Sequence, residues 1–207
     1  KVLDQASLKK LPYLPLGPDA QVLEHRRVPF ASFPYEWAPE MLWAAAEMTL
    51  DLTESVCADG LGIKDATPFN ILFEGPNPIF IDIMSFGPRK PTDTNWLAQS
   101  QFSQTFLNPL LSQRSLGMSL KQIFLANQNG LEPNEIYRMC SPWQRLRPPF
   151  LGLVSLQAWF SRSEIKESLY ETKGEKNPEK AQFIYKHLLK GQRKALRSVS
   201  PAKNINS

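Results

Sequence analysis

The chain has 207 residues, 42% of them hydrophobic and 21% charged, a balance that predicts a globular protein with a sizeable core and excludes a largely disordered chain. No apolar run reaches the roughly 20 residues that cross a bilayer, and the N-terminus lacks the pattern of a signal peptide. We therefore expect a cytoplasmic protein without a membrane partner. Cys57 and Cys140 show neither metal-binding nor disulfide spacing, so we expect both to be reduced and structural.

The formal net charge is +4, and the basic surplus lies toward the C-terminus. A basic run of this kind is usually the solvated face of a helix, and aromatic residues do not alternate with it as they do in clefts for single-stranded nucleic acid. We therefore do not expect a nucleic-acid partner. The run comprises Lys173, Lys176, Lys180, Lys186, Lys190, Arg193, Lys194 and Arg197.

In chain order, residues 1–22 have no sustained helical period and contain several prolines, so we expect an irregular segment. Residues 28–33 fit an edge strand or an extended connection, because Pro29 and Pro34 remove backbone donors there. Pro39 then begins a long predicted helix, 39–59, which Gly60 ends. Its apolar residues recur every three or four positions and predict one buried face: Met41, Ala45, Met48, Leu52 and Val56.

Residues 64–86 predict a polar loop followed by a β-hairpin. Two apolar runs, 71–74 and 79–83, have the length of strands, and Gly and Pro residues separate them. Asp65 and Asn70 lie in the loop before the hairpin, and Asp82 lies near the end of the second predicted strand. Because a hairpin folds back on itself, these three side chains are expected to meet at one end of it.

Helices dominate the rest of the chain. A second long helix is predicted over residues 95–115, with a buried stripe and with Pro109 as a kink or an end. Shorter helices are expected from Ser119, from Pro133 and over residues 150–160, and a basic amphipathic helix over residues 178–198. The stripe of the helix 95–115 comprises Trp96, Phe102, Phe106, Leu110 and Leu111, and that of the basic helix comprises Phe183, Ile184, Leu188, Leu189 and Leu196.

These elements predict an α+β fold that is mainly helical and carries a small β-hairpin. We divide the chain into an irregular segment, 1–22, a main domain, 23–170, and a linker with the basic helix, 171–207. Because the chain begins at Lys1 rather than at a methionine, we expect it to be part of a longer protein.

The polar residues of the loop and hairpin suit phosphoryl transfer. This chemistry needs a carboxylate beside the attacking hydroxyl and oxygen ligands that hold magnesium against phosphates. Asp65 fits the first role, and Asn70 and Asp82 fit the second, since magnesium takes hard oxygen ligands and often only one or two carboxylates. The alternative is turn capping by Asp65 and Asn70. It accounts poorly for Asp82, because a carboxylate flanked by Ile81 and Ile83 needs a partner when it is buried.

Two segments carry a family resemblance: K-D-A-T-P-F-N-I-L-F, from residue 64, and P-I-F-I-D-I-M-S-F, from residue 78. Their spacing resembles the catalytic loop and metal-binding segment of the protein-kinase-like fold, especially its aminoglycoside-phosphotransferase branch. With P-Y-E-W at 34–37 and R-L-R-P-P-F at 145–150, the chain resembles the N-terminal region of bacterial class I S-adenosylmethionine-dependent methyltransferases of the nodulation-protein-like type.

The resemblance implies a kinase-like C-terminal lobe with ATP and Mg²⁺ as cofactors. It places Asp65 at the catalytic-base position, Lys64 at a cofactor-binding position, and Asn70 and Asp82 at metal positions. It also makes residues 28–37 a hinge-like connection. The sequence departs from the kinase pattern, because no His precedes the loop and no glycine-rich phosphate loop or lysine–glutamate pair is identifiable.

As a function, the resemblance implies a nucleotide- and Mg²⁺-binding domain of a larger methyltransferase-type transferase. S-adenosylmethionine would bind only to an attached methyltransferase domain absent from this chain, and the substrate, a small molecule or a protein, is not identified. The residues leave open whether this part transfers phosphate. One alternative is an inert pseudokinase scaffold that recruits a substrate or partner to the methyltransferase domain. Another is a plain helical interaction domain, in which Asp65 and Asp82 would lie far apart.

Overall fold

The computed structural model describes residues 22, 24–160 and 175–201. The chain divides into two compact units, Lys1–Phe30 and Ala31–Ser207. The described residues of the first unit contain no helix or strand, so the edge strand expected over 28–33 is not formed there, and His25, Arg26 and Arg27 are exposed. Most of the segment 1–22 lies outside the described residues.

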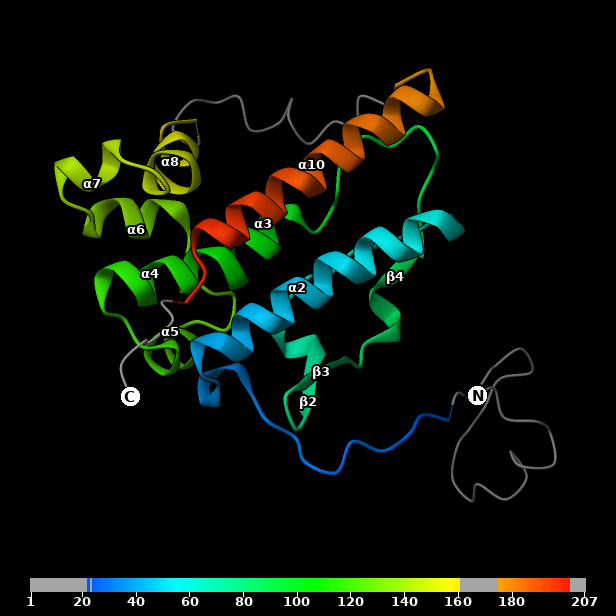
Figure 1. Ribbon diagram of the computed structural model, residues 1–207, viewed down its shortest axis with the longest axis horizontal. Helices are drawn as coiled ribbons and strands as arrows, with labels where there is room; N and C mark the ends of the chain where they lie inside the picture. The colour runs from blue at the N-terminus through cyan, green and yellow to red at the C-terminus, as the bar shows by residue number, and fades with distance from the viewer. Residues whose placement is uncertain (1–21, 23, 161–174, 202–207) are drawn as a thin grey trace. The chain divides into compact units, whose positions relative to one another are not determined.

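The second unit is α+β and mainly helical, as the sequence predicts (Figure 1). None of the helices in its described part is both long and apolar enough to cross a membrane. Short 3-10 turns lie at Pro34–Glu36, Cys57–Asp59, Pro68–Asn70 and Ile83–Ser85, and π-helical turns lie at Ser103–Leu107 and Leu151–Ser155. The helices are α2 (Pro39–Val56), α3 (Gln99–Phe102), α4 (Asn108–Leu116), α5 (Leu120–Ala126), α6 (Pro133–Met139), α7 (Pro142–Leu146), α8 (Leu156–Phe160) and α10 (Pro178–Ser198), and the strands are β1 (Leu61–Ile63), β2 (Ile71–Glu74), β3 (Asn77–Phe80) and β4 (Phe86–Pro88).

Helix α2 confirms the long helix expected after Pro39, but the predicted buried face is wrong in phase. Of the five residues expected on that face only Ala45 is fully buried. The helix packs against α10, α4 and β3, so its buried surface is wider than a single stripe. Thr49 and Thr53 belong to that surface because their hydroxyls donate to the carbonyls of Ala45 and Thr49, at 2.8 and 2.7 Å. The buried residues are Leu42, Ala45, Ala46, Thr49, Leu50 and Thr53.

The strands form two small antiparallel pairs. The predicted hairpin is present as β2 and β3, with Ile71 opposite Phe80 and Glu74 opposite Asn77. The second pair was not predicted: β1 and β4 align Leu61 with Pro88, so the chain between them is a closed loop. The whole candidate site lies inside that loop.

Helices α3 and α4 continue into one another through the π-helical turn Ser103–Leu107 and together correspond to the helix predicted over 95–115. Pro109 explains the π-helical turn. The amide of Asn108 bonds to the carbonyl of Ser103, five residues back, so the next amide in this pattern would serve Gln104. Pro109 has no N–H, and the carbonyl of Gln104 accepts instead from the amide of Leu131, at 3.0 Å. The proline is therefore accommodated without ending the helix.

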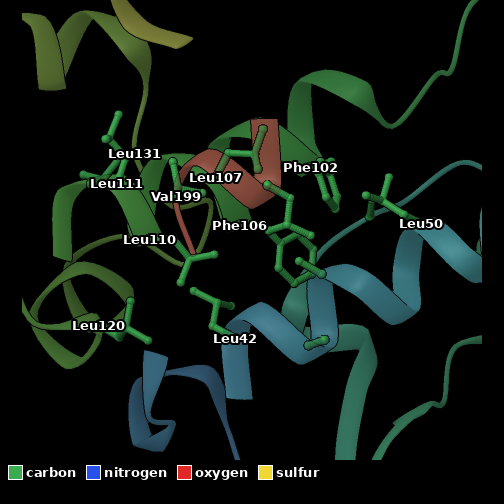
Figure 2. Packing of buried hydrophobic residues seen from close by; sticks show 14 of the residues in the cluster. Leu42, Leu50, Phe102, Phe106, Leu107, Leu110, Leu111, Leu120, Leu131 and Val199 are labelled. Carbon is green, nitrogen blue, oxygen red and sulfur yellow. The ribbon is translucent and has the colours of Figure 1, made fainter. Parts of the chain in front are cut away.

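The core surrounds this combined helix (Figure 2). All five apolar residues predicted for its stripe are at most 4% exposed, which confirms that part of the sequence analysis. Leu42 and Leu50 of α2, Leu120 of α5 and Val199 after α10 pack in the same cluster. Cys57 and Cys140 are free thiols, as expected.

Helix α10 has the predicted bounds, but its buried face differs from the prediction. Leu189 and Leu196 are buried as expected, whereas Phe183 is 61% exposed. The helix lies alongside α2 (Figure 1), and its inner face is rotated toward Ala181 and Tyr185.

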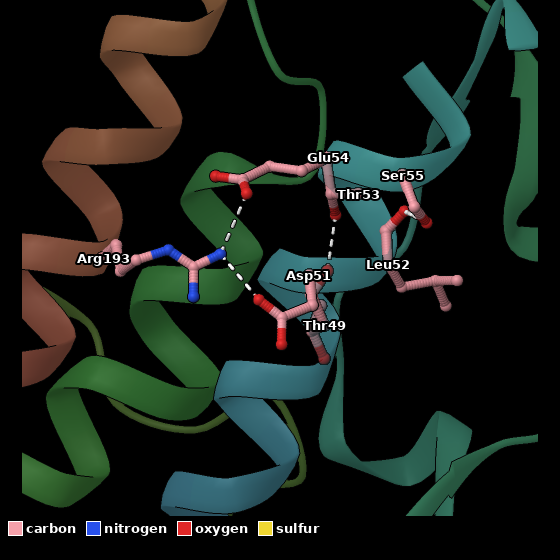
Figure 3. A network of polar contacts seen from close by, with 7 residues as sticks. All are labelled: Thr49, Asp51, Leu52, Thr53, Glu54, Ser55 and Arg193. Atoms are coloured by element: carbon pink, nitrogen blue, oxygen red, sulfur yellow. Dashed lines mark hydrogen bonds and ion pairs between the residues drawn. The ribbon is translucent and has the colours of Figure 1, made fainter. Parts of the chain in front are cut away.

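One cation links the two long helices. The guanidinium Nη2 of Arg193 contacts Asp51 Oδ1 at 2.8 Å and Glu54 Oε2 at 3.1 Å (Figure 3). Burial opposes the charge of Arg193, but the hydrogen bond to Asp51 and the charges of Glu54 and Asp51 outweigh it and raise its pKa. The basic surplus of α10 is therefore partly neutralised by α2.

We expect Arg193→Met to lower the free energy of unfolding by about 0.5 to 1 kcal/mol, because it removes a partly exposed ion-pair cluster. The loss should shrink as salt is added, and urea unfolding at two ionic strengths measures it. Lys194→Met is the control: it removes the same charge from a neighbouring exposed residue. Equal losses in the two variants would contradict the assigned link.

Gly130 provides a second test. Its φ is +76°, and a Cβ there would collide with the Gln104 carbonyl, which accepts from the Leu131 amide. We expect Gly130→Ala to cost about 3 kcal/mol, combining left-handed strain with overpacking. Gly117→Ala, with φ of +71° and nothing within 4 Å of the added Cβ, should cost only about 1 kcal/mol. Chemical unfolding of both variants measures the two losses of stability. Similar losses would contradict the close approach of Gly130 to the Gln104 carbonyl.

Candidate functional site

The loop that carries the predicted site residues begins directly at the end of β1. The amide of Lys64 donates to the Ser85 carbonyl at 2.8 Å, extending the β1–β4 pairing by one bond. At the other end, the amide of Ile81 donates to the Asn70 carbonyl at 2.9 Å and extends the β2–β3 hairpin. The two pairs of strands thus bring residues 64–70 next to residues 81–85.

Ser85 links the side chains of Asn70 and Asp82, and Asn70 also bonds to the backbone of Asp65. The Asn70 side-chain amide donates to the Asp65 backbone carbonyl at 3.3 Å and to the Ser85 hydroxyl at 2.9 Å. The Ser85 hydroxyl in turn donates to Asp82 Oδ2 at 2.6 Å, a short bond of the kind that a charged acceptor makes. The helical-domain alternative, with Asp65 and Asp82 far apart, does not fit this arrangement.

Asp82 is placed differently from the prediction. The second strand ends at Phe80, not at residue 83, so Asp82 lies beyond the strand and caps the 3-10 turn Ile83–Ser85. Its Oδ1 accepts from the Met84 amide at 3.0 Å. The flanking Ile81 and Ile83 are 45% and 46% exposed, while Asp82 is partly buried and has the hydrogen-bond partners that a buried carboxylate needs. The second strand begins at Asn77, two residues before the predicted start.

The loop is fixed to the helical core on its other side. The side chain of Gln101 accepts from the Ala66 amide at 2.7 Å, and the Thr105 hydroxyl donates to the Ala66 carbonyl at 3.1 Å. The Trp96 indole donates to the Ile63 carbonyl at 3.1 Å. Residues on both sides of Asp65 are therefore held by the α3 region, while the Asp65 side chain itself is exposed.

Lys64, the predicted cofactor-binding residue, is exposed and runs along the neighbouring strand. A Cβ added to Gly87 would lie 2.9 Å from Lys64 Cδ, so Gly87 leaves the room that the lysine stem occupies. Lys64 also lines a small hollow of about 40 Å³ beside Trp96 and Tyr185. The aliphatic part of the Lys64 side chain therefore packs against β4, directly before Asp65 in the chain.

The donor atoms fit a divalent cation in part. With its amide nitrogen engaged, Asn70 offers a hard oxygen, and each carboxylate oxygen of Asp82 keeps a lone pair beyond the one hydrogen bond assigned to it. Two such ligands suit Mg²⁺ that retains water or phosphate oxygens. Within the described residues there is no cluster of three His, Cys, Asp or Glu side chains for a metal, so a site here would depend on the amide.

Sequence reasoning missed the residues that hold the site together. Ser85 lies three positions after Asp82, the spacing of a capping interaction, and this signal was available. Gln101 and Thr105 gave no signal, because they reach the loop from a helix more than thirty positions away. Residues 28–37, for which a hinge-like connection was expected, span the boundary between the two units and include the 3-10 turn Pro34–Glu36.

A separate hollow of about 240 Å³ lies where α2 ends and α10 begins, and it is lined by Arg89, Cys57 and Gln182 among others. The Arg89 guanidinium lies 4.0 Å from the ring centre of Tyr185. Burial raises the pKa of Tyr185 to about 12, although the charge of Arg89 acts in the opposite direction. None of the residues that line this hollow belongs to the Asp65 network.

We expect Ser85→Ala to destabilise the protein by about 2 kcal/mol, because it removes a buried hydroxyl that bonds both an amide and a carboxylate. Urea unfolding measures the loss. Ser55→Ala is a control that removes an exposed hydroxyl bonded only to the Leu52 carbonyl, with an expected effect within about 0.5 kcal/mol. A neutral Ser85 variant would contradict the network.

Comparison with known protein sequences finds a match to one part of a longer protein. The chain is 31% identical over 145 residues to nodulation protein NoeA of Rhizobium meliloti (strain 1021), a match that covers 70% of this chain and 27% of NoeA. The chain therefore corresponds to about a quarter of the length of that protein. No protein-family model and no solved structure matches. The chain is thus similar in sequence to one part of a nodulation protein.

Proposed function

We propose that this chain is the kinase-like, nucleotide- and Mg²⁺-binding part of a larger S-adenosylmethionine-dependent methyltransferase-type transferase. The observation that carries the proposal is the hydrogen-bond chain from the Asp65 carbonyl through Asn70 and Ser85 to Asp82. It gathers the three residues that the motif resemblance assigns to one site. The similarity to NoeA covers only part of that protein, and it supports a place in a longer polypeptide.

The proposed roles follow from the positions of the side chains. Asp65 is exposed on a loop whose backbone is held at Ala66, which suits a base that must reach a substrate hydroxyl. Asn70 and Asp82 would hold Mg²⁺ with their oxygens, and Lys64 would contact a phosphate. Bound Mg²⁺·ATP would supply the phosphoryl group and the charge that orients it. Methyl transfer would belong to an attached domain that binds S-adenosylmethionine.

One observation favours a second candidate, an inert scaffold that recruits a substrate or partner to the methyltransferase domain. Both carboxylate oxygens of Asp82 accept hydrogen bonds within the turn Ile83–Ser85, so this residue has a structural role without any metal. In this alternative Asn70 and Ser85 serve only to close the loop. The two candidates differ in whether the site responds to nucleotide.

Thermal unfolding with Mg²⁺·ATP separates them. If the site binds nucleotide, a ligand concentration ten times the Kd should stabilise the chain by about 1.4 kcal/mol, which raises Tm by several degrees in a protein of this size. Asp82→Asn should abolish the rise while keeping a similar side-chain shape. Asn70→Ala should also abolish the rise in Tm, and it serves as the test if Asp82→Asn proves unstable.

Asp93→Asn is the matched control, because Asp93 also caps a turn, accepting from the Lys90 amide at 2.9 Å, and lies outside the network. This variant should keep the response to Mg²⁺·ATP. Absence of any rise in the unmodified chain would exclude the nucleotide site and leave the scaffold. A rise that survives in both Asp82→Asn and Asn70→Ala would place nucleotide elsewhere.

A further inference from the structure

Helices α7 and α8 carry large apolar side chains on their outer faces. Trp143 and Leu146 lie three positions apart on α7 and are 74% and 58% exposed. Leu156 and Trp159 lie three positions apart on α8 and are 40% and 41% exposed. Side chains at this spacing share one side of a helix. The opposite side of α8 faces the interior of the protein, since Ala158 is 1% exposed.

Helices α7 and α8 both contact Tyr137 of α6. The Trp159 indole donates to the Tyr137 hydroxyl at 3.1 Å, and the Arg145 guanidinium lies 4.2 Å from the centre of the same tyrosine ring. The Ser155 hydroxyl donates to the Arg145 carbonyl at 2.7 Å and ties the start of α8 to α7. Figure 1 shows α6, α7 and α8 grouped together. We call Trp143, Leu146, Leu156 and Trp159 the α7–α8 face.

The segment that carries this face has charges of one sign. From residue 138 to residue 160 the chain has three arginines, no lysine and no acidic residue. Arg145 is packed on Tyr137, whereas Arg138 and Arg147 are exposed. An occupant that covers the apolar side chains would therefore meet two exposed guanidinium groups, and acidic groups would complement them.

Composition distinguishes between classes of occupant. Protein interfaces are enriched in Trp, Met and Arg and depleted of Lys, Asp and Glu, and this segment follows that pattern. Helices that lie on anionic bilayers typically use Lys as well as Arg, yet the segment has no lysine although the chain is rich in it. A second copy of the chain fits less well, because a two-fold contact would place like arginines near each other.

We propose that the α7–α8 face binds a protein segment that combines apolar and acidic side chains. Trp143 and Leu146 anchor the segment, and Arg138 and Arg147 pair with its carboxylates. The Trp159 indole N–H is already bonded to Tyr137, so its ring can be covered without losing a hydrogen bond with water. This inference is independent of nucleotide binding at Asp82.

The test is selection of phage-displayed random 16-residue peptides on the immobilised 207-residue chain, after depletion on the Trp143→Ala/Leu146→Ser variant. Both mutated side chains are exposed, so the variant should keep the far-UV circular dichroism and Tm of the parent. We expect the enriched peptides to be net negative and to carry spaced apolar residues.

Binding of a synthetic copy of the most enriched peptide then measures how much the apolar residues and the arginines contribute to the affinity. Fluorescence titration should show binding weakened at least about tenfold by Trp143→Ala/Leu146→Ser, as for an interface anchor. Arg138→Glu/Arg147→Glu should weaken it as well and reduce its dependence on salt. Phe183→Ala, which truncates a 61% exposed aromatic residue on α10, is the control and should leave the affinity unchanged.

Three results would overturn the proposal. One is enrichment of neutral or basic peptides, or of peptides that bind the double variant equally well. Another is binding to vesicles of phosphatidylglycerol and phosphatidylcholine that depends on Trp143, which would assign the face to a membrane. The third is a dimer in sedimentation experiments that the double variant abolishes, which would assign it to a second copy.

Discussion

The missing N–H of Pro109 is the constraint on which much of this fold depends. It leaves the Gln104 carbonyl without a partner in its own helix, and the π-helical turn Ser103–Leu107 presents that carbonyl to the Leu131 amide. The segment after α5 is drawn against the central helix, where Asn108 also donates to the Leu131 carbonyl at 2.8 Å. Only glycine fits at position 130, so this contact restricts the sequence as well as the backbone.

The same turn positions the candidate site. Thr105 lies within it and bonds to the Ala66 carbonyl, while Gln101, one turn earlier, accepts from the Ala66 amide. The Asp65 loop is thereby fixed to a helix whose apolar side chains lie in the core. Its other side is closed by the β1–β4 and β2–β3 pairs. A loop held at both sides keeps its exposed carboxylate in one place, as both a catalytic site and a recognition site require.

The proposed site and the α7–α8 face are two regions of different chemistry. The first consists of polar groups in a small hydrogen-bonded network, and the second of exposed indole and aliphatic side chains on a segment whose charges are arginines. The two share no residue, so the two proposals can fail or hold separately.

The sequence by itself determined the elements: the helix after Pro39, the stripe from Trp96 to Leu111, the hairpin and the residues grouped around it. These depend on local periodicity and on proline and glycine, which act over a few positions. The faces that α2 and α10 bury, and the end of β3 before Asp82, depended on what each element packs against. Only the tertiary structure decided them, because the elements they pack against lie far away in the chain. Gln101 and Thr105 likewise hold the loop at Ala66 through contacts that local patterns do not encode.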